Sequence, residues 1–111
     1  MGAFVKGDVV VIAFPYSDFS QTKKRPALVL AVPREDEVIL CQITGRNTRP
    51  EHTISLSDDD FADGGLQKLS YVRPDHLFTV ESTVIKYKAG RIKEEKLSSI
   101  IEASVEILRE L

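Results

Sequence analysis

The chain has 111 residues, of which 42% are apolar and 29% charged. This size and composition predict one folded domain over residues 1–111 and exclude a disordered chain. The net charge of −2 argues against a protein that coats nucleic acid with its whole surface. No apolar run approaches the roughly 20 residues of a membrane span. No signal peptide is recognisable, so we expect a cytoplasmic protein without membrane contact.

The reactive side chains of the sequence are few. Cys41 is the only cysteine, so no internal disulfide is expected, and its apolar neighbours favour a core thiol over a nucleophile. His52 and His76 lie far apart, and the usual zinc patterns are missing. Either histidine has the pKa range of an acid or base, but each is isolated. We therefore expect no metal and no cofactor.

The first half of the chain predicts three strands. Residues 8–14 are rich in Val and Ile and stop at Pro15. A polar loop over residues 15–24 follows, and its length of about ten residues is typical of functional loops. The continuous apolar runs 27–32 and 38–43 predict two buried strands, which we expect to form a hairpin joined by a turn.

The middle of the chain predicts shorter elements. Residues 44–50 read as a loop and residues 52–56 as a short strand. The stretch 57–61 predicts a cap and one helical turn that begins with aspartates, which we favour over a cation site. Gly64 and Gly65 predict a hinge or turn.

The last third of the chain changes its apolar period. Residues 70–80 predict a strand interrupted at Pro74, and residues 83–88 another that ends at Ala89-Gly90. Apolar residues at helical spacing then predict a helix over residues 93–110. The pattern indicates a mainly β protein with a C-terminal α-helix: a small, strongly bent barrel closed by the helix.

Two side chains at strand ends are candidates for phosphate chemistry. Arg25 precedes Pro26 at the mouth of a buried strand, and its guanidinium offers a bidentate fork to phosphate. A surface arginine or a salt bridge is the plainer reading. Thr44 ends the strand 38–43, where its hydroxyl could hold a phosphate oxygen or cap the turn.

The remaining candidates surround these two positions. Arg73 and Asp75 flank Pro74, which places a cation and a carboxylate close together, either for chemistry or as a structural ion pair. Ser20 and Gln21 could contact bases or only solvate their loop. The candidate cations for RNA binding lie in two short segments: Lys23 and Lys24, and Arg46.

Four blocks, in order, resemble the MazF/PemK family of toxins. The opening Gly7-Asp8 and its apolar strand to Phe14-Pro15 is similar to the family's first strand. Arg25-Pro26-Ala27-Leu28-Val29-Leu30 resembles its second. Cys41-Gln42-Ile43-Thr44 resembles the segment that ends on the family's catalytic threonine. The last block is Asp63-Gly64-Gly65-Leu66 with Ser70-Tyr71-Val72-Arg73-Pro74-Asp75.

The resemblance implies a barrel of SH3-like topology and of the MazF/PemK/CcdB toxin type. It implies a homodimeric endoribonuclease toxin, an mRNA interferase, that cleaves single-stranded RNA without a metal and is neutralised by a cognate antitoxin. Arg25 and Thr44 would carry the chemistry, with Arg73 and Asp75 matching an R-x-D pair of the plasmid-encoded branch. The RNA's own 2′-hydroxyl would attack the neighbouring phosphate.

Two departures from the family pattern and two alternatives remain. The loop before Arg25 lacks the family's glutamate and glycine, and it also lacks the histidine of the plasmid-encoded branch. One alternative is a protein-binding toxin of the same fold that poisons DNA gyrase. The other is a non-catalytic RNA-binding regulator.

Overall fold

The computed structural model describes residues 4–15, 22–47 and 50–110 of the chain. These residues form seven strands, three short 3₁₀ helices and one α-helix. In chain order the elements are β1 (Asp8–Pro15), β2 (Thr22–Arg34), β3 (Glu37–Thr44), η1 (Pro50–His52), β4 (Ile54–Leu56), η2 (Asp58–Asp60), β5 (Phe61–Gly64), β6 (Ser70–Glu81), η3 (Ser82–Val84), β7 (Ile85–Ile92) and α1 (Glu94–Glu110).

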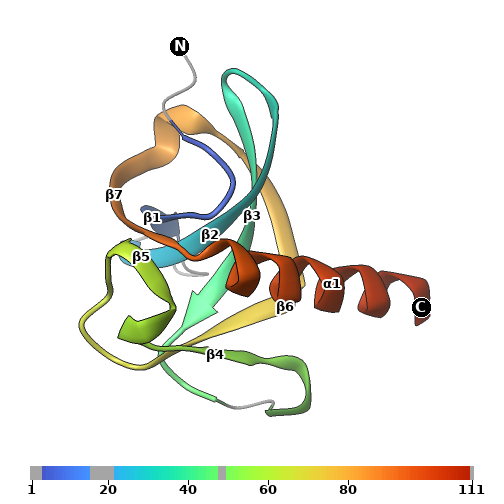
Figure 1. The fold of residues 1–111 in the computed structure, drawn as a ribbon. Coiled ribbons are helices and arrows are strands. Elements are labelled where there is room, and N and C mark those ends of the chain that lie inside the picture. The colour runs from blue at the N-terminus through green and yellow to red at the C-terminus, as the bar shows by residue number, and fades with distance from the viewer. Residues whose placement is uncertain (1–3, 16–21, 48–49, 111) are drawn as a thin grey trace.

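All seven strands belong to one antiparallel sheet. Its order is β4-β6-β3-β2-β1-β7-β5, so β2 lies at the centre between β3 and β1, and β4 and β5 lie at the two ends. The sheet curls on itself, and α1 runs past β6 and then away from the curled sheet (Figure 1). The predicted mainly β fold with a C-terminal helix is confirmed. In the described ranges no helix has the length and apolar character that crossing a membrane requires.

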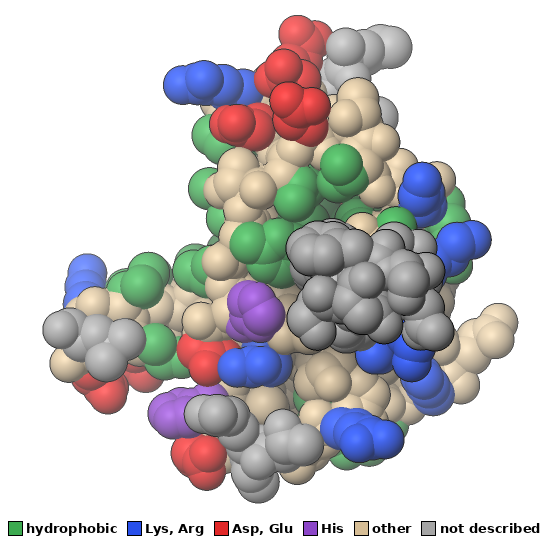
Figure 2. Space-filling view, turned by 180° about the vertical axis from the view of Figure 1, so that it is seen from behind, with side chains coloured by type: hydrophobic (Ala, Val, Ile, Leu, Met, Phe, Trp, Pro, Cys, Tyr) green, Lys and Arg blue, Asp and Glu red, His purple; other side chains and the backbone are tan. Residues whose placement is uncertain are grey.

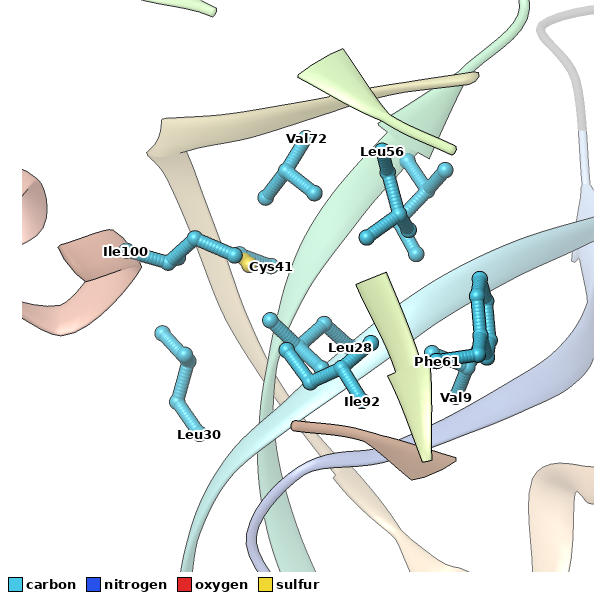
Figure 3. Close-up of a cluster of buried hydrophobic side chains, with 10 residues drawn as sticks. Val9, Leu28, Leu30, Cys41, Leu56, Phe61, Val72, Ile92 and Ile100 are labelled. Carbon is cyan, nitrogen blue, oxygen red and sulfur yellow. The ribbon is translucent and has the colours of Figure 1, made fainter. Parts of the chain in front are cut away.

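The apolar core lies inside the curl. Every strand and the helix supply at least one buried side chain to it (Figure 3). Cys41 belongs to this cluster with no exposed surface, as the sequence predicted. The nine labelled members in Figure 3 are Val9, Leu28, Leu30, Cys41, Leu56, Phe61, Val72, Ile92 and Ile100.

A second, smaller cluster lies on the opposite face of β1, β2 and β3. Its buried members alternate along each strand with those of the core, because successive side chains of a strand point to opposite faces. On β3 the second cluster takes Val38 and Leu40, whereas the core takes Cys41 and Ile43. The same alternation places Gln42 and Thr44 on the face of the second cluster, beyond its apolar end.

The helix α1 contacts the sheet where the pairing of β6 with β3 is interrupted. Cys41 of β3 pairs with Leu77 and Gln42 pairs with Arg73, so residues 74–76 have no partner on β3. Pro74 lacks an N–H group and interrupts the ladder here, as expected. The buried hydroxyl of Ser104 on α1 donates to the carbonyl of Pro74 at 2.8 Å. This hydrogen bond joins the helix to the bend.

Several predicted boundaries were wrong. Strands β4 and β7 each begin two residues later than predicted, because His52 belongs to η1 and residues 83–84 belong to η3. The structure continues β7 through Gly90 to Ile92, and it forms β5 up to Gly64, where the sequence indicated turns. A Cβ atom at Gly64 would collide with the carbonyl of Ala89, and one at Gly90 with the carbonyl of Asp63. Both glycines therefore let two strands approach closely; β7 continues past Gly90, whereas Gly64, at φ 68°, is the last residue of β5. Strand β2 also begins at Thr22, within the segment predicted as a loop.

Candidate functional site

A single cleft of about 630 Å³ brings together most of the predicted site residues. It lies at the ends of β2 and β3 and extends to the segment that leads into β6. Its floor and walls are formed by Lys23, Lys24, Arg25, Pro26, Gln42, Ile43, Thr44, Gly45, Arg46, Lys68 and Ser70.

The cleft is strongly cationic although the whole chain carries a formal charge of −2. Five of its described lining residues are Lys or Arg, and none of those lining residues carries a carboxylate. Like charges that converge in one hollow raise the local potential and attract an anionic ligand. Figure 2 shows one face of the molecule on which Lys and Arg side chains gather on one side, whereas most Asp and Glu side chains lie elsewhere.

Arg25 is positioned by the rigid strand on which it lies. Its backbone pairs with Ile12 of β1, and the next residue, Pro26, restricts Arg25 to the extended conformation of β2. On the other side of β2, Ala27 pairs with Gln42 of β3. Two residues further along this antiparallel pair, the same register places Arg25 opposite Thr44. The half-buried Arg25 and Thr44 therefore lie on one face of adjacent strands.

Thr44 is held at the last position of β3. Its Oγ1 accepts a hydrogen bond from the backbone N–H of Arg46 at 3.2 Å, across the turn at Gly45. Because the oxygen accepts this bond, the hydroxyl hydrogen is directed elsewhere and can serve as a donor. A ligand phosphate in the cleft would offer it an acceptor.

Arg73 and Asp75 form the predicted pair, next to the cleft and not in its lining. Arg73 Nη2 lies 3.4 Å from Asp75 Oδ2, with both side chains about a quarter exposed. Arg73 Nη1 donates to Oε1 of Gln42, also at 3.4 Å. Since Gln42 lines the cleft, it connects this ion pair to the cleft. The Nε atom of Arg73 is buried without a hydrogen-bond partner among the described residues.

Three polar side chains of the cleft were missed in the sequence: Gln42, Lys68 and Ser70. Gln42 could have been found, because a strand that ends on Thr44 places the residue two positions earlier on the same face. Lys68 and Ser70 depend on how β6 pairs with β3 and β4, which no local pattern encodes. The predicted Ser20 and Gln21 lie outside the described residues.

The other reactive groups lie apart from the cleft. Burial raises the pKa of the Cys41 thiol from 9.0 to about 12, so this sulfur stays protonated in the core. His76 packs edge to face against Phe78, and His52 lines a separate depression of about 230 Å³ beside α1. Within the ranges that the structure describes, no three His, Cys, Asp or Glu side chains come together as metal ligands.

Comparison with known proteins gives one family. The sequence pattern of the PemK-like, MazF-like toxins of type II toxin–antitoxin systems matches residues 5–108. No curated protein shows significant sequence similarity to the chain.

Solved structures resemble the fold over nearly its whole length. An endoribonuclease in complex with its cognate antitoxin from Mycobacterial species superimposes with a TM-score of 0.76, at 15% identity and with 96% of each chain covered. MazE-MazF from Deinococcus radiodurans gives 0.76 at 17% identity, again over 96% of each chain. Mycobacterium tuberculosis toxin MazF-mt6 gives 0.71 at 19% identity, over 92% of this chain and 96% of that one.

Proposed function

Since this chain belongs to the family of PemK-like, MazF-like toxins of type II toxin–antitoxin systems, we propose that it is an endoribonuclease. Its substrate would be single-stranded RNA, cut at preferred short sequences without a metal. Two of the structures that share its fold are named as endoribonucleases, which supports the proposal.

The observation that carries the proposal is the composition of the cleft. Five cations, Arg25 among them, converge in a hollow of about 630 Å³, and Thr44 lies there on the strand next to that of Arg25. RNA presents one negative charge for each phosphate, and its association with a protein is dominated by such Lys and Arg contacts. The cations can also stabilise the extra charge of a phosphorane-like transition state, which is the main demand of the reaction.

The reaction that fits these groups uses the RNA's own 2′-hydroxyl as nucleophile. The 2′-oxygen bonds to the neighbouring phosphorus, the bond to the 5′-oxygen of the next nucleotide breaks, and a 2′,3′-cyclic phosphate and a 5′-hydroxyl result. One proton leaves the 2′-oxygen and another reaches the departing 5′-oxygen. Arg25 would stabilise the charge on the non-bridging oxygens, and Thr44 would donate a hydrogen bond to one of them.

Arg73 and Asp75 would assist from the edge of the cleft. Asp75 is connected to this end of the site through its pair with Arg73, and we assign it the role of the base that removes the 2′-proton. Arg73 would act as a second phosphate clamp. The loop residues Ser20 and Gln21, with Lys23, Lys24 and Arg46, would hold the RNA on both sides of the cut.

The partners follow from the same proposal. Two proteins of this fold are described as complexes, one with a cognate antitoxin and one as MazE-MazF. We therefore expect a cognate antitoxin that covers the cationic cleft of this chain, and a homodimer as the toxin's own state. We expect the protein to act in the cytoplasm, where mRNA is found.

The test uses a long single-stranded RNA in EDTA, with and without a single 2′-deoxynucleotide at a mapped cut. We expect discrete cuts that leave a cyclic phosphate and a 5′-hydroxyl, and no cut at the deoxynucleotide. Cleavage at the deoxynucleotide, or only with added Mg²⁺, would overturn the mechanism. Well-folded protein that cuts none of several RNAs would overturn the function.

A further inference from the structure

Gln42 occupies a central place between the two parts of the site. It lines the cleft with Arg25 and Thr44, and it is the cross-strand neighbour of both Ala27 on β2 and Arg73 on β6. Its side chain is half-buried and lies on the same face of β3 as that of Thr44. Its amide is neutral, whereas five of the eight polar side chains that line this cleft are cationic.

Arg73 determines which way the Gln42 amide faces. The guanidinium has five N–H donors and no acceptor, so only the oxygen of the amide can lie against it. Oε1 of Gln42 is the atom at 3.4 Å from Arg73 Nη1. The NH₂ group must then point away from Arg73, and within the described ranges it has no hydrogen-bond partner. The amide is thus presented to the cleft as a donor and not as an acceptor.

Most of the remaining polar groups of the cleft have the same polarity, and the exception is Ser70, whose hydroxyl donates to the carbonyl of Lys68 at 3.3 Å. Thr44 accepts from the N–H of Arg46 and keeps its hydroxyl hydrogen for a ligand. The lysines and arginines are donors only. The phosphates of a bound strand will be taken by these cations, because a charged hydrogen bond is about twice as strong as a neutral one. The Gln42 amide is therefore available for an uncharged acceptor, and the bases carry such acceptors.

We propose that Gln42 reads one base of the RNA beside the cut and selects a carbonyl oxygen there, because Arg73 holds its amide as a donor. Uracil O4 and guanine O6 are acceptors at the position where cytosine and adenine carry an amino group. The protein should therefore prefer uracil or guanine to cytosine or adenine at one position of its recognition sequence. This inference rests on the proposed ribonuclease function and adds the residue that sets its specificity.

The experiment measures base frequencies around the cut with a randomised single-stranded RNA digested in EDTA. Wild type is compared with Gln42→Glu, Gln42→Met and, as a control, Thr83→Glu. Gln42→Glu keeps an oxygen for Arg73 but turns the other polar atom into an acceptor. Gln42→Met removes both polar atoms of the side chain. Thr83→Glu adds the same charge at an exposed position of η3, which follows the C-terminal end of β6.

We expect the wild type to favour carbonyl bases about tenfold at one position, in line with the discrimination of one good base contact. Gln42→Glu should reverse this preference towards amino bases, and Gln42→Met should abolish it. Thr83→Glu should keep the wild-type frequencies. The added charge in Gln42→Glu will also slow cleavage, but equally at all sites, so base frequencies separate recognition from electrostatics.

Arg73 supplies a second arm of the test. Arg73→Lys keeps the charge but loses the planar fork, so the carbonyl preference should weaken. In a Gln42→Met background the same change should leave base frequencies unaltered. Independent effects of the two changes on base frequency would show that Arg73 does not act through Gln42, and would overturn the proposed coupling.

The outcomes separate this inference from the proposed function. If the folded wild type cuts no RNA, the function fails and the inference fails with it. If wild type cuts and both Gln42 variants keep its base frequencies, the inference alone is overturned, whether or not their rates fall. Circular dichroism and melting temperature of each variant confirm that the compared proteins are folded.

Discussion

Two faces of a single strand, β3, differ sharply. Cys41 and Ile43 have no exposed surface and pack in the core, whereas Gln42 and Thr44, which alternate with them, line the cationic cleft. The two-residue period of a strand thus makes one short segment both a wall of the core and the floor of the site. The dense packing behind the strand fixes its backbone, and hydrogen bonds from Arg46 to Thr44 and from Arg73 to Gln42 orient the two polar side chains.

The largest contrast between the faces is expected in thiol reactivity. Burial raises the pKa of Cys41 to about 12, so its thiolate fraction near neutral pH falls about 10³-fold through ionisation alone. Native protein should resist iodoacetamide, and unfolded protein should react. The matched variant, Thr44→Cys with Cys41→Ala, should react while folded. Equal rates of reaction with iodoacetamide for the two native proteins would contradict the assignment of Cys41 to the core face of β3 and Thr44 to its cleft face.

The same thiol has a consequence for stability at alkaline pH. The pKa is raised in the folded state, so the unfolded chain loses this proton first, near pH 9.0. The contribution of Cys41 to stability is complete below that pH and decreases as the pH rises towards about 12. Cys41→Ala should therefore show a smaller loss of stability across that window in urea titrations.

Truncation on the core face should lower stability strongly. Ile43→Ala removes a fully buried side chain, and such changes cost about 2–5 kcal/mol of the free energy of unfolding. Thr44→Ala, one residue further, should cost less than about 1 kcal/mol because this side chain is only partly buried. Urea unfolding of the two variants measures the difference. A larger loss for Thr44→Ala would place it in the core.

Truncation on the cleft face should lower activity instead. Thr44→Ala removes one donor to the transition state, for which a loss of about 10² in kcat is typical. Thr44→Ser keeps the hydroxyl and should restore most of the rate. Single-turnover cleavage of a short RNA tests both variants. Loss of activity in Thr44→Ser as great as in Thr44→Ala would indicate that the methyl group, and not the hydroxyl, matters.

The smallest effect is expected at the edge of the cleft. Lys68→Gln removes one of the five cations of the cleft. The slope of the logarithm of the RNA-binding constant against the logarithm of salt concentration should therefore become less steep by about 0.7, the value for one phosphate contact on a single strand. Lys86→Gln, at an exposed position of β7 away from the cleft, is the matched control and should bind RNA like the wild type. Identical slopes for both variants would remove Lys68 from the RNA contacts.

The sequence predicted those parts of the fold that depend on local pattern. The apolar runs gave β1, the centre of β2 and β3, and the helical period gave α1 within one residue at its start. Strand β5 and the end of β7 were missed because Gly64 and Gly90 look like turn residues, whereas their role is close contact between two backbones. That role is visible only once the two strands are paired.

The site was predictable to a similar extent. Arg25 and Thr44 follow from their positions at strand ends and from the family resemblance, and the structure places both in one cleft. Lys68 was missed because its approach to the cleft depends on pairing between strands distant in the sequence. The unpaired residues after Arg73 explain why Arg73 and Asp75 lie beside the cleft and contact it through Gln42.

The most direct test of the account compares purified wild type with Arg25→Ala on a long single-stranded RNA in EDTA. Arg25 lies in the cleft and belongs to neither apolar cluster, so the variant should stay folded. Its cleavage rate should fall by about 10²–10³, the usual loss for a charge-stabilising donor. Full activity in a folded Arg25→Ala protein would contradict the claim that this cleft cuts RNA.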